Sequence, residues 1–203
     1  MRTFEPGGGA KTHAVLVAIP IALAVIVGCS SSSGSASDDD GAGLTGTTAP
    51  ADIVVEADDF TALSDMTPVR GFFVSNLRGE LDEAVAVAED PEGGVYPVGT
   101  VIQLIPQEAM VKRAPGFDAD SNDWEFFTLE ATAEGTTIVT RGGSEVVNGF
   151  SGLSCASCHS AAEPEFDFVC EDTHGCAPLP VGDDVITAIQ QSDPRPRRGA
   201  APG

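Results

Sequence analysis

The chain has 203 residues, of which 10 are basic and 31 are acidic, giving a formal net charge of −21. That charge argues against nucleic acid or an anionic lipid surface as a partner, because both repel a polyanion. Hydrophobic residues make up 42% of the chain, which excludes full disorder. No apolar run reaches the roughly 18–20 residues of a membrane-spanning helix. The length favours one folded domain.

The N-terminus reads as an export signal. A basic segment precedes an apolar run over residues 14–28, which is too short for a comfortable membrane span, so residues 1–28 are predicted to be a signal peptide. Gly28 followed by Cys29 resembles the lipobox of bacterial lipoprotein precursors. The resemblance implies that Cys29 is lipidated and begins the mature chain, and that Ser30 directs it to the outer membrane, facing the periplasm. The alternative is a short membrane anchor with an incidental cysteine.

Removing residues 1–28 takes away Arg2, Lys11 and Glu5, so the mature chain has a formal charge of −22. Residues 29–50 are rich in Ser, Gly, Asp and Thr and bury too little surface to fold, so we expect a flexible linker behind the lipid. The proline-containing residues 191–203 are expected to be a disordered tail. The folded domain is then predicted to span residues 51–190.

Within that domain the sequence predicts an α+β fold, mainly an antiparallel sheet with a few short helices. Leu81, Ala84, Val85 and Ala88 follow the spacing of one helical face. Runs rich in β-branched and aromatic residues predict strands. The expected strands lie at 71–75, 98–105, 108–113 and, as a hairpin, at 124–131 and 136–141. Further short helices are expected at 155–159 and after Asp183.

Residues 155–159 read Cys-Ala-Ser-Cys-His. This C-x-x-C-H pattern is the attachment motif of c-type haem. Cysteines three residues apart on one helical turn both reach the vinyl groups on one porphyrin edge, and the next residue lies under the iron. The sequence therefore predicts one covalent haem c bound by Cys155 and Cys158, with His159 as the iron ligand.

Two alternatives need no haem. The C-x-x-C pair alone is also the pattern of a disulfide. The four cysteines of the domain also have a spacing that suits zinc, with His159 or His174 as a substitute ligand. The members of that set are Cys155, Cys158, Cys170 and Cys176.

Cys170 and Cys176 enclose five residues, and in an oxidising compartment a disulfide between them is expected. His174 lies inside this loop and is a candidate sixth iron ligand, although the pattern favours an exposed loop histidine. The other possible ligands are Met66, Met110 and Lys112. Met110 stands in an apolar strand, where methionine also fills a core.

The order of several short motifs resembles the cytochrome P-460 family, which includes the cytochromes c-prime-beta. The matching stretch is about 96–170, and its pieces are residues 96–101, 109–112, 123–127, 155–159 and 166–169. The resemblance implies an exported, largely antiparallel-β protein with C-x-x-C-H near its C-terminus. The loop closed by Cys170 and Cys176 is not part of the family pattern.

The resemblance also implies site roles. In the P-460 members a lysine is cross-linked to the porphyrin and hydroxylamine is oxidised, and Lys112 is the matching position. The c-prime-beta members instead bind nitric oxide in an apolar distal pocket. Oxidation of an N–H bond needs a carboxylate as proton acceptor, for which Glu125 and Glu130 are the candidates. Four phenylalanines are the candidates for a distal wall, although their default role is to fill the core; they are Phe72, Phe73, Phe126 and Phe127.

Three functions follow. The first is a five-coordinate haem lipoprotein that binds or oxidises a small nitrogen species. The second is a six-coordinate electron-transfer lipoprotein whose acidic surface attracts a basic redox partner. The third is a haem-free lipoprotein stapled by disulfides or zinc.

Overall fold

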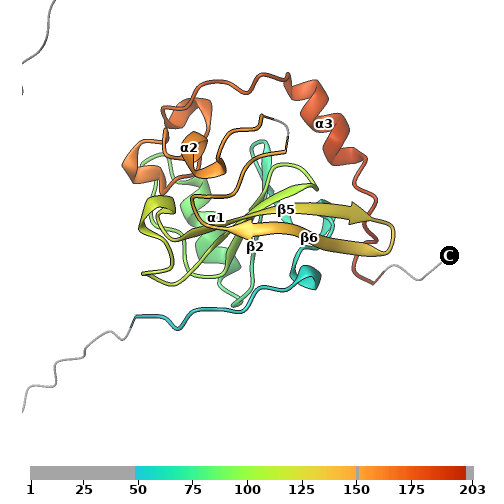
Figure 1. Cartoon of the computed structure of the whole chain (residues 1–203), viewed down its shortest axis with the longest axis horizontal. Coiled ribbons are helices and arrows are strands. Elements are labelled where there is room, and N and C mark those ends of the chain that lie inside the picture. The colour runs from blue at the N-terminus through green and yellow to red at the C-terminus, as the bar shows by residue number, and fades with distance from the viewer. Residues whose placement is uncertain (1–48, 150, 200–203) are drawn as a thin grey trace, which may run out of the picture. The chain divides into compact units, whose positions relative to one another are not determined.

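A six-stranded antiparallel sheet with strand order β1-β2-β3-β4-β5-β6 organises the domain (Figure 1). The computed structural model describes residues 49–149 and 151–199. The predicted signal peptide, the lipidation of Cys29 and nearly all of the linker lie outside the described residues. The strands are β1 Thr67–Val69, β2 Phe72–Asn76, β3 Thr100–Gln103, β4 Glu108–Lys112, β5 Trp124–Thr132 and β6 Gly135–Gly142, and the α-helices are α1 Leu81–Glu89, α2 Cys155–His159 and α3 Asp183–Gln191.

The α+β class and the antiparallel sheet predicted from the sequence are confirmed. Helix α1 buries Ala84 and Ala88, as its hydrophobic spacing predicts. Strand β1 was not predicted, because three residues that include Pro68 give no periodic signal. The N-cap of α3 is Gly182, and Asp183 is the first helical residue. Its negative charge there interacts favourably with the positive end of the helix dipole.

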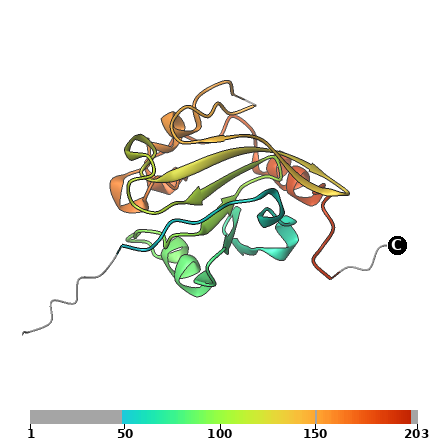
Figure 2. The ribbon, with the colours of Figure 1, turned by 60° about the horizontal axis from the view of Figure 1, so that its bottom comes forward.

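The sheet has an apolar core on each face. The face that carries α2, here called the attachment face, buries Phe72, Met110, Trp124 and Phe126 together with Ala156. The opposite face, here called the far face, buries Val111, Phe127 and Leu129 of the strands together with Val55 and Phe60 of the segment that enters the domain. Figure 2 shows residues 51–65 and α2 on opposite sides of the β5–β6 hairpin.

This division corrects the expected phenylalanine wall. Consecutive residues of a strand point to opposite faces, so two adjacent phenylalanines cannot line one side. Phe72 and Phe126 belong to the attachment-face core, whereas Phe73 and Phe127 pack into the far-face core. At most half of the predicted wall is therefore on the side of α2.

Part of the segment expected to be a loose tail packs on the domain. The side chain of Asp193 accepts a hydrogen bond from the backbone N–H of Leu63 at 2.8 Å and pairs with Arg195 at 2.8 Å. Arg195 is 5% exposed. The backbone N–H of Arg198 donates to Asp65. Among the described residues, no helix is long and apolar enough to cross a membrane.

Candidate haem-attachment site

Helix α2 is fixed at its start by the loop that follows β6. The backbone N–H of Cys155 donates to the carbonyl of Val146 at 2.8 Å, and Val147 pairs with Ser154 in an isolated bridge. The Ser154 side chain caps the helix by accepting from the N–H of Ser157. The predicted helix over the C-x-x-C-H motif is therefore present, and its position on the sheet is set by backbone bonds.

The two cysteines of α2 are free thiols, half-buried at Cys155 and exposed at Cys158. Burial raises the pKa of the Cys155 thiol to about 11, with the nearby charge of Glu108 as a smaller cause. Both side chains stand on one helical turn, the arrangement that covalent attachment to one porphyrin edge requires.

The predicted disulfide between Cys170 and Cys176 is confirmed, with Cα atoms 5.7 Å apart. It removes two of the four thiols that the zinc alternative needs. Among residues 49–149 and 151–199, no group of three or more His, Cys, Asp or Glu side chains is arranged to hold a metal ion. The disulfide also abuts α2, because Cys170 Sγ lies 3.4 Å from the carbonyl oxygen of Cys158.

His159 is oriented by one backbone contact. Its Nδ1 lies 2.8 Å from the carbonyl oxygen of Phe168. A carbonyl can only accept, so Nδ1 carries the proton. Burial lowers the pKa of His159, so at pH 7 the ring is neutral and its lone pair is on Nε2. Metal-binding histidines are typically oriented in this way by a carbonyl behind the ring. The ring also packs on Phe126, with centroids 5.1 Å apart.

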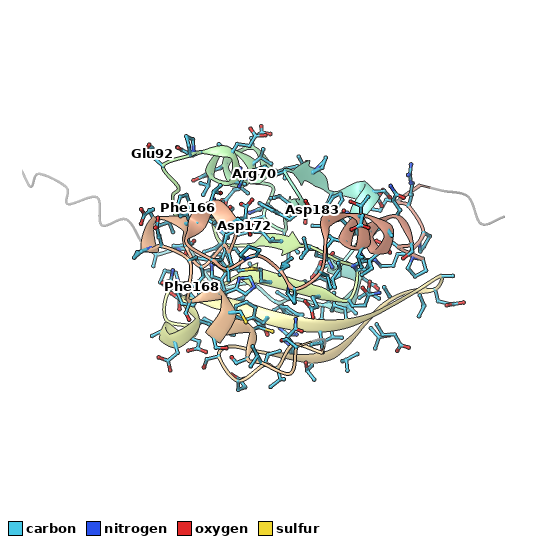
Figure 3. All side chains as sticks on the ribbon, turned by 90° about the horizontal axis from the view of Figure 1, so that it is seen from above. Arg70, Glu92, Phe166, Phe168, Asp172 and Asp183 are labelled. Atoms are coloured by element: carbon cyan, nitrogen blue, oxygen red, sulfur yellow. A yellow bond between two sulfur atoms is a disulfide. The ribbon has the colours of Figure 1, made fainter. Side chains whose placement is uncertain are left out.

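The carbonyl behind His159 belongs to an unusual turn. Asp167 and Phe168 both adopt left-handed backbone conformations, with φ of 50° and 66°. Such conformations are costly for non-glycine residues and persist only where surrounding contacts hold them. The indole N–H of Trp124 donates to the carbonyl of Asp167 at 2.7 Å, while the Asp167 carboxylate accepts from the backbone N–H of Tyr96 at 2.9 Å. This segment crosses the face seen from above, where Phe166, Phe168 and Asp172 are labelled (Figure 3).

Lys112 lies on the attachment face, as a haem-edge residue requires, but its ammonium group is already engaged. Nζ is 2.6 Å from Asp167 Oδ1 and 2.8 Å from the carbonyl oxygen of Asn122. It also lies 5.2 Å from the centre of the Trp124 ring. The side chain is 8% exposed. A cross-link to a porphyrin at Nζ would require these contacts to break.

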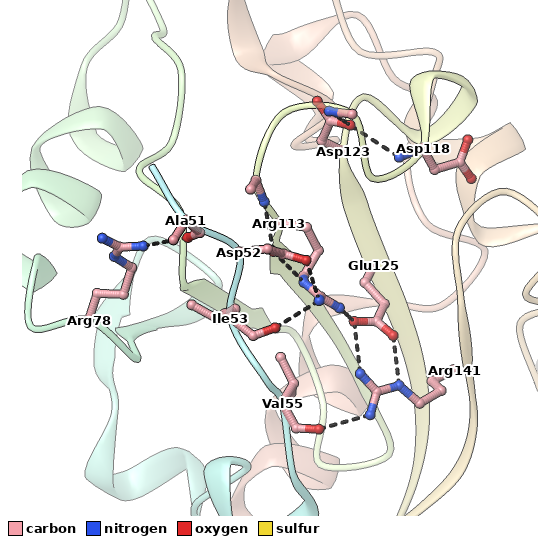
Figure 4. A network of polar contacts seen from close by, with 12 residues as sticks. Ala51, Asp52, Ile53, Val55, Arg78, Arg113, Asp118, Asp123, Glu125 and Arg141 are labelled. Carbon is pink, nitrogen blue, oxygen red and sulfur yellow. Dashed lines mark hydrogen bonds and ion pairs between the residues drawn. The ribbon is translucent and has the colours of Figure 1, made fainter. Parts of the chain in front are cut away.

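Glu125 points to the far face of the sheet, away from α2. Two guanidinium groups, those of Arg113 and Arg141, bind its carboxylate, and Arg141 contributes contacts of 2.7 and 3.1 Å (Figure 4). The same arginines donate to the carbonyls of Ile53 and Val55 and so hold the segment entering the domain. This position corrects the expectation that Glu125 accepts a proton from a haem-bound substrate. Glu130, the other candidate, is exposed near the end of β5.

The candidate sixth ligands are also placed. His174 is buried, with its ring stacked 3.7 Å from that of Phe166 and its Nδ1 donating to the carbonyl of Val169 at 2.8 Å. It is therefore not the exposed loop histidine allowed by the sequence. Met66 belongs to the far-face core, so it is on the wrong side of the sheet. Met110 is 4% exposed in the attachment-face core.

The chain on either side of α2 presents large apolar side chains to solvent. They occur in the loop before the helix and in the segment that leads to and begins α3, and both segments lie on the α2 side in Figure 1. Exposed apolar side chains of this kind are available to pack against a bound group. They are Val147 at 53%, Leu153 at 56%, Leu179 at 54%, Val181 at 43% and Val185 at 44% exposure.

These residues fit a haem c. Two free thiols on one turn, a neutral histidine with Nδ1 tied back, and apolar side chains open to solvent are the features that such a group needs. Sequence reasoning found the thiols and His159 from the motif. It missed the role of the Phe168 carbonyl, because a backbone acceptor leaves no residue signature, and it missed Asp167, which looked like one more acidic residue in an acidic chain.

Comparisons with models of protein families, with curated proteins and with solved structures gave no match. The geometry of the site therefore carries the functional argument.

Proposed function

We propose that this chain is a mono-haem c-type cytochrome in which Cys155 and Cys158 hold the haem and His159 binds its iron. The observation that carries the proposal is the 2.8 Å contact between His159 Nδ1 and the carbonyl of Phe168, directly beside two free thiols. A fold stapled only by disulfides has no use for a neutral imidazole held with Nε2 available, and the Cys170–Cys176 disulfide leaves a zinc site only two of its four thiols.

We further propose that the haem is five-coordinate and binds a small nitrogen ligand such as nitric oxide. The bound haem supplies an iron with an open position for a diatomic ligand. The chain supplies His159 and an apolar surround, because Phe72, Met110 and Phe126 are among the buried strand residues of the attachment face. An apolar surround favours an uncharged ligand over a charged one.

Oxidation of hydroxylamine is the less supported branch of the same proposal. It needs a proton acceptor beside the iron, and Glu125 lies on the far face between two arginines. It also relies on a lysine free to react with the porphyrin, whereas Lys112 Nζ makes two hydrogen bonds. Binding without turnover requires neither group.

Six-coordinate electron transfer is the second candidate function. Its histidine version requires the His174 ring to leave its stack with Phe166 and its bond to Val169. Its methionine version is favoured by one observation, the position of Met110 on the attachment face. The acidic surface would then attract a basic redox protein.

In this proposal the protein is exported and anchored to the membrane only through the lipid on Cys29, facing the periplasm. The first described residues support this proposal, because residues 51–55 are held on the domain by an ion pair and by hydrogen bonds. Asp52 pairs with Arg113 at 2.6 Å, and the carbonyls of Ala51, Ile53 and Val55 accept from three different arginines. A flexible linker would therefore become fixed on the far face, opposite the proposed haem.

The test is expression of the full chain in a host that exports it and attaches haem. We expect covalent haem that survives denaturation in the wild type and is lost in the double variant Cys155→Ala/Cys158→Ala. The matched control is Cys170→Ser/Cys176→Ser, which also removes two cysteines and should retain covalent haem. Absence of covalent haem from the wild type, with both α2 thiols still free, would refute the proposal.

A further inference from the structure

We infer that Lys112 and Asp167 form a buried ion pair that positions His159 through the carbonyl of Phe168. The role rests on the proposed function, because it gives the pair a purpose only if His159 binds iron. It assigns Lys112 to positioning, as an alternative to its reacting with the haem.

The contacts form a continuous path from the sheet to the imidazole. Lys112 Nζ, on β4, binds Asp167 Oδ1 at 2.6 Å, and the side-chain amide of Asn122 binds the same oxygen at 2.6 Å. The N–H of Tyr96 occupies the other carboxylate oxygen at 2.9 Å. The next residue along the chain is Phe168, whose carbonyl accepts from His159 Nδ1.

Both members of the pair are buried, with side-chain exposures of 8% for Lys112 and 2% for Asp167. Replacing such a pair with apolar residues is often neutral or favourable for stability, so burial alone is a weak reason to place charges here. A carboxylate that accepts hydrogen bonds from three donors does, however, restrain the backbone conformation of its own residue. That rigidity is needed at this turn, because Asp167 and Phe168 are both left-handed.

The position of His159 depends on this turn more than on α2. The helix is only five residues long, and its last residue is His159 itself. The polar contact of the ring is with Phe168, and its aromatic contact is with Phe126. If the turn relaxes, the carbonyl swings away from Nδ1, and the ring loses the bond that defines its orientation and its proton position.

The Asp167→Asn variant tests this inference without requiring haem. In the full chain prepared without haem, we expect the Nδ1–H of His159, followed by NMR, to exchange with solvent about ten-fold faster than in the wild type, the effect of weakening one net hydrogen bond. In the haem-loaded chain we expect a lower iron–histidine stretching frequency in the ferrous Raman spectrum. Lys112→Met should change both readouts in the same direction.

The matched control is Glu171→Gln, four residues further on, which breaks the more exposed pair with Arg70 and should leave both readouts unchanged. If Asp167→Asn does not fold, Asn122→Gly replaces it. This variant removes one donor to Asp167 while keeping a residue that tolerates the φ of 51°. If the exchange rate of the His159 Nδ1–H and the iron–histidine stretching frequency in these variants equal those of the wild type, the inference is overturned. A wild type without haem would instead defeat the proposed function, and the exchange measurement would still decide the role of the pair.

Discussion

Replacing Glu125 by Gln separates the two roles that sequence and structure give to this residue. The structure makes it the shared anion of Arg113 and Arg141, 3% exposed on the far face. Glutamine preserves the size of the side chain but removes the charge, so two guanidinium groups are left facing a neutral amide. We expect a large loss of stability and an unchanged haem environment.

The size of the loss follows from burial. Breaking a buried, hydrogen-bonded ion pair costs about 3–5 kcal/mol, whereas an exposed pair contributes about 0–1 kcal/mol. With a urea m-value of about 2 kcal/mol/M for a domain of this size, Glu125→Gln should lower the unfolding midpoint by about 1.5–2.5 M. The control Arg70→Met breaks a pair whose side chains are 41% and 20% exposed, and should shift the midpoint by less than about 0.5 M.

The assay is urea unfolding followed by the fluorescence of Trp124, combined with an absorption spectrum of the haem-loaded chain. A midpoint shift for Glu125→Gln as small as that of Arg70→Met would refute the assignment of Glu125 to a buried structural pair. A changed haem spectrum with intact stability would place its carboxylate beside the iron, contrary to the structure.

Three more outcomes are expected. In the haem-free chain at pH 8, iodoacetamide should modify Cys158 well before Cys155, because a pKa of about 11 leaves only ~0.1% of Cys155 as thiolate; equal rates by peptide mass mapping would contradict this. Burial raises the pKa of Glu108, so folding stability should fall as pH rises through that pKa. Glu108→Gln should therefore raise the melting temperature at pH 7, abolish this pH dependence and accelerate alkylation of Cys155. An unaltered pH profile of stability in the variant would contradict this prediction. Replacing Cys170 and Cys176 with serine should cost about 2 kcal/mol in urea unfolding, the entropy of a short closed loop, while a loss of all structure would show a larger role.

The sheet was predictable because its signals are local. The strand of Phe72, the strand pair around Pro106 and the hairpin after Trp124 each combine β-rich runs with a turn, and all three appear near their expected bounds. The helix over Leu81–Glu89 followed from its apolar spacing. The Cys170–Cys176 disulfide followed from the short spacing of two cysteines in a chain expected to enter an oxidising compartment.

The chemistry of the individual carboxylates was not predictable. Glu125 and Asp167 look alike in a chain with 31 acidic residues, yet one pairs with two arginines on the far face and the other holds a strained turn on the attachment face. Glu125 faces the far side because side chains alternate along its strand. Asp167 is set apart by its contact with Lys112, which lies 55 positions away in the sequence. The sequence carries no local signal for the orientation of His159 by the Phe168 carbonyl or for the packing of residues 192–199, because both depend on hydrogen bonds of backbone groups.

An absorption spectrum of the exported chain in its oxidised and reduced states decides whether the protein is a five-coordinate haem c protein. We expect covalent haem with a broad, five-coordinate reduced spectrum that changes when nitric oxide is added, and no normal haem spectrum in His159→Ala. A chain that carries no haem, or one whose sharp six-coordinate bands do not respond to nitric oxide, would contradict it.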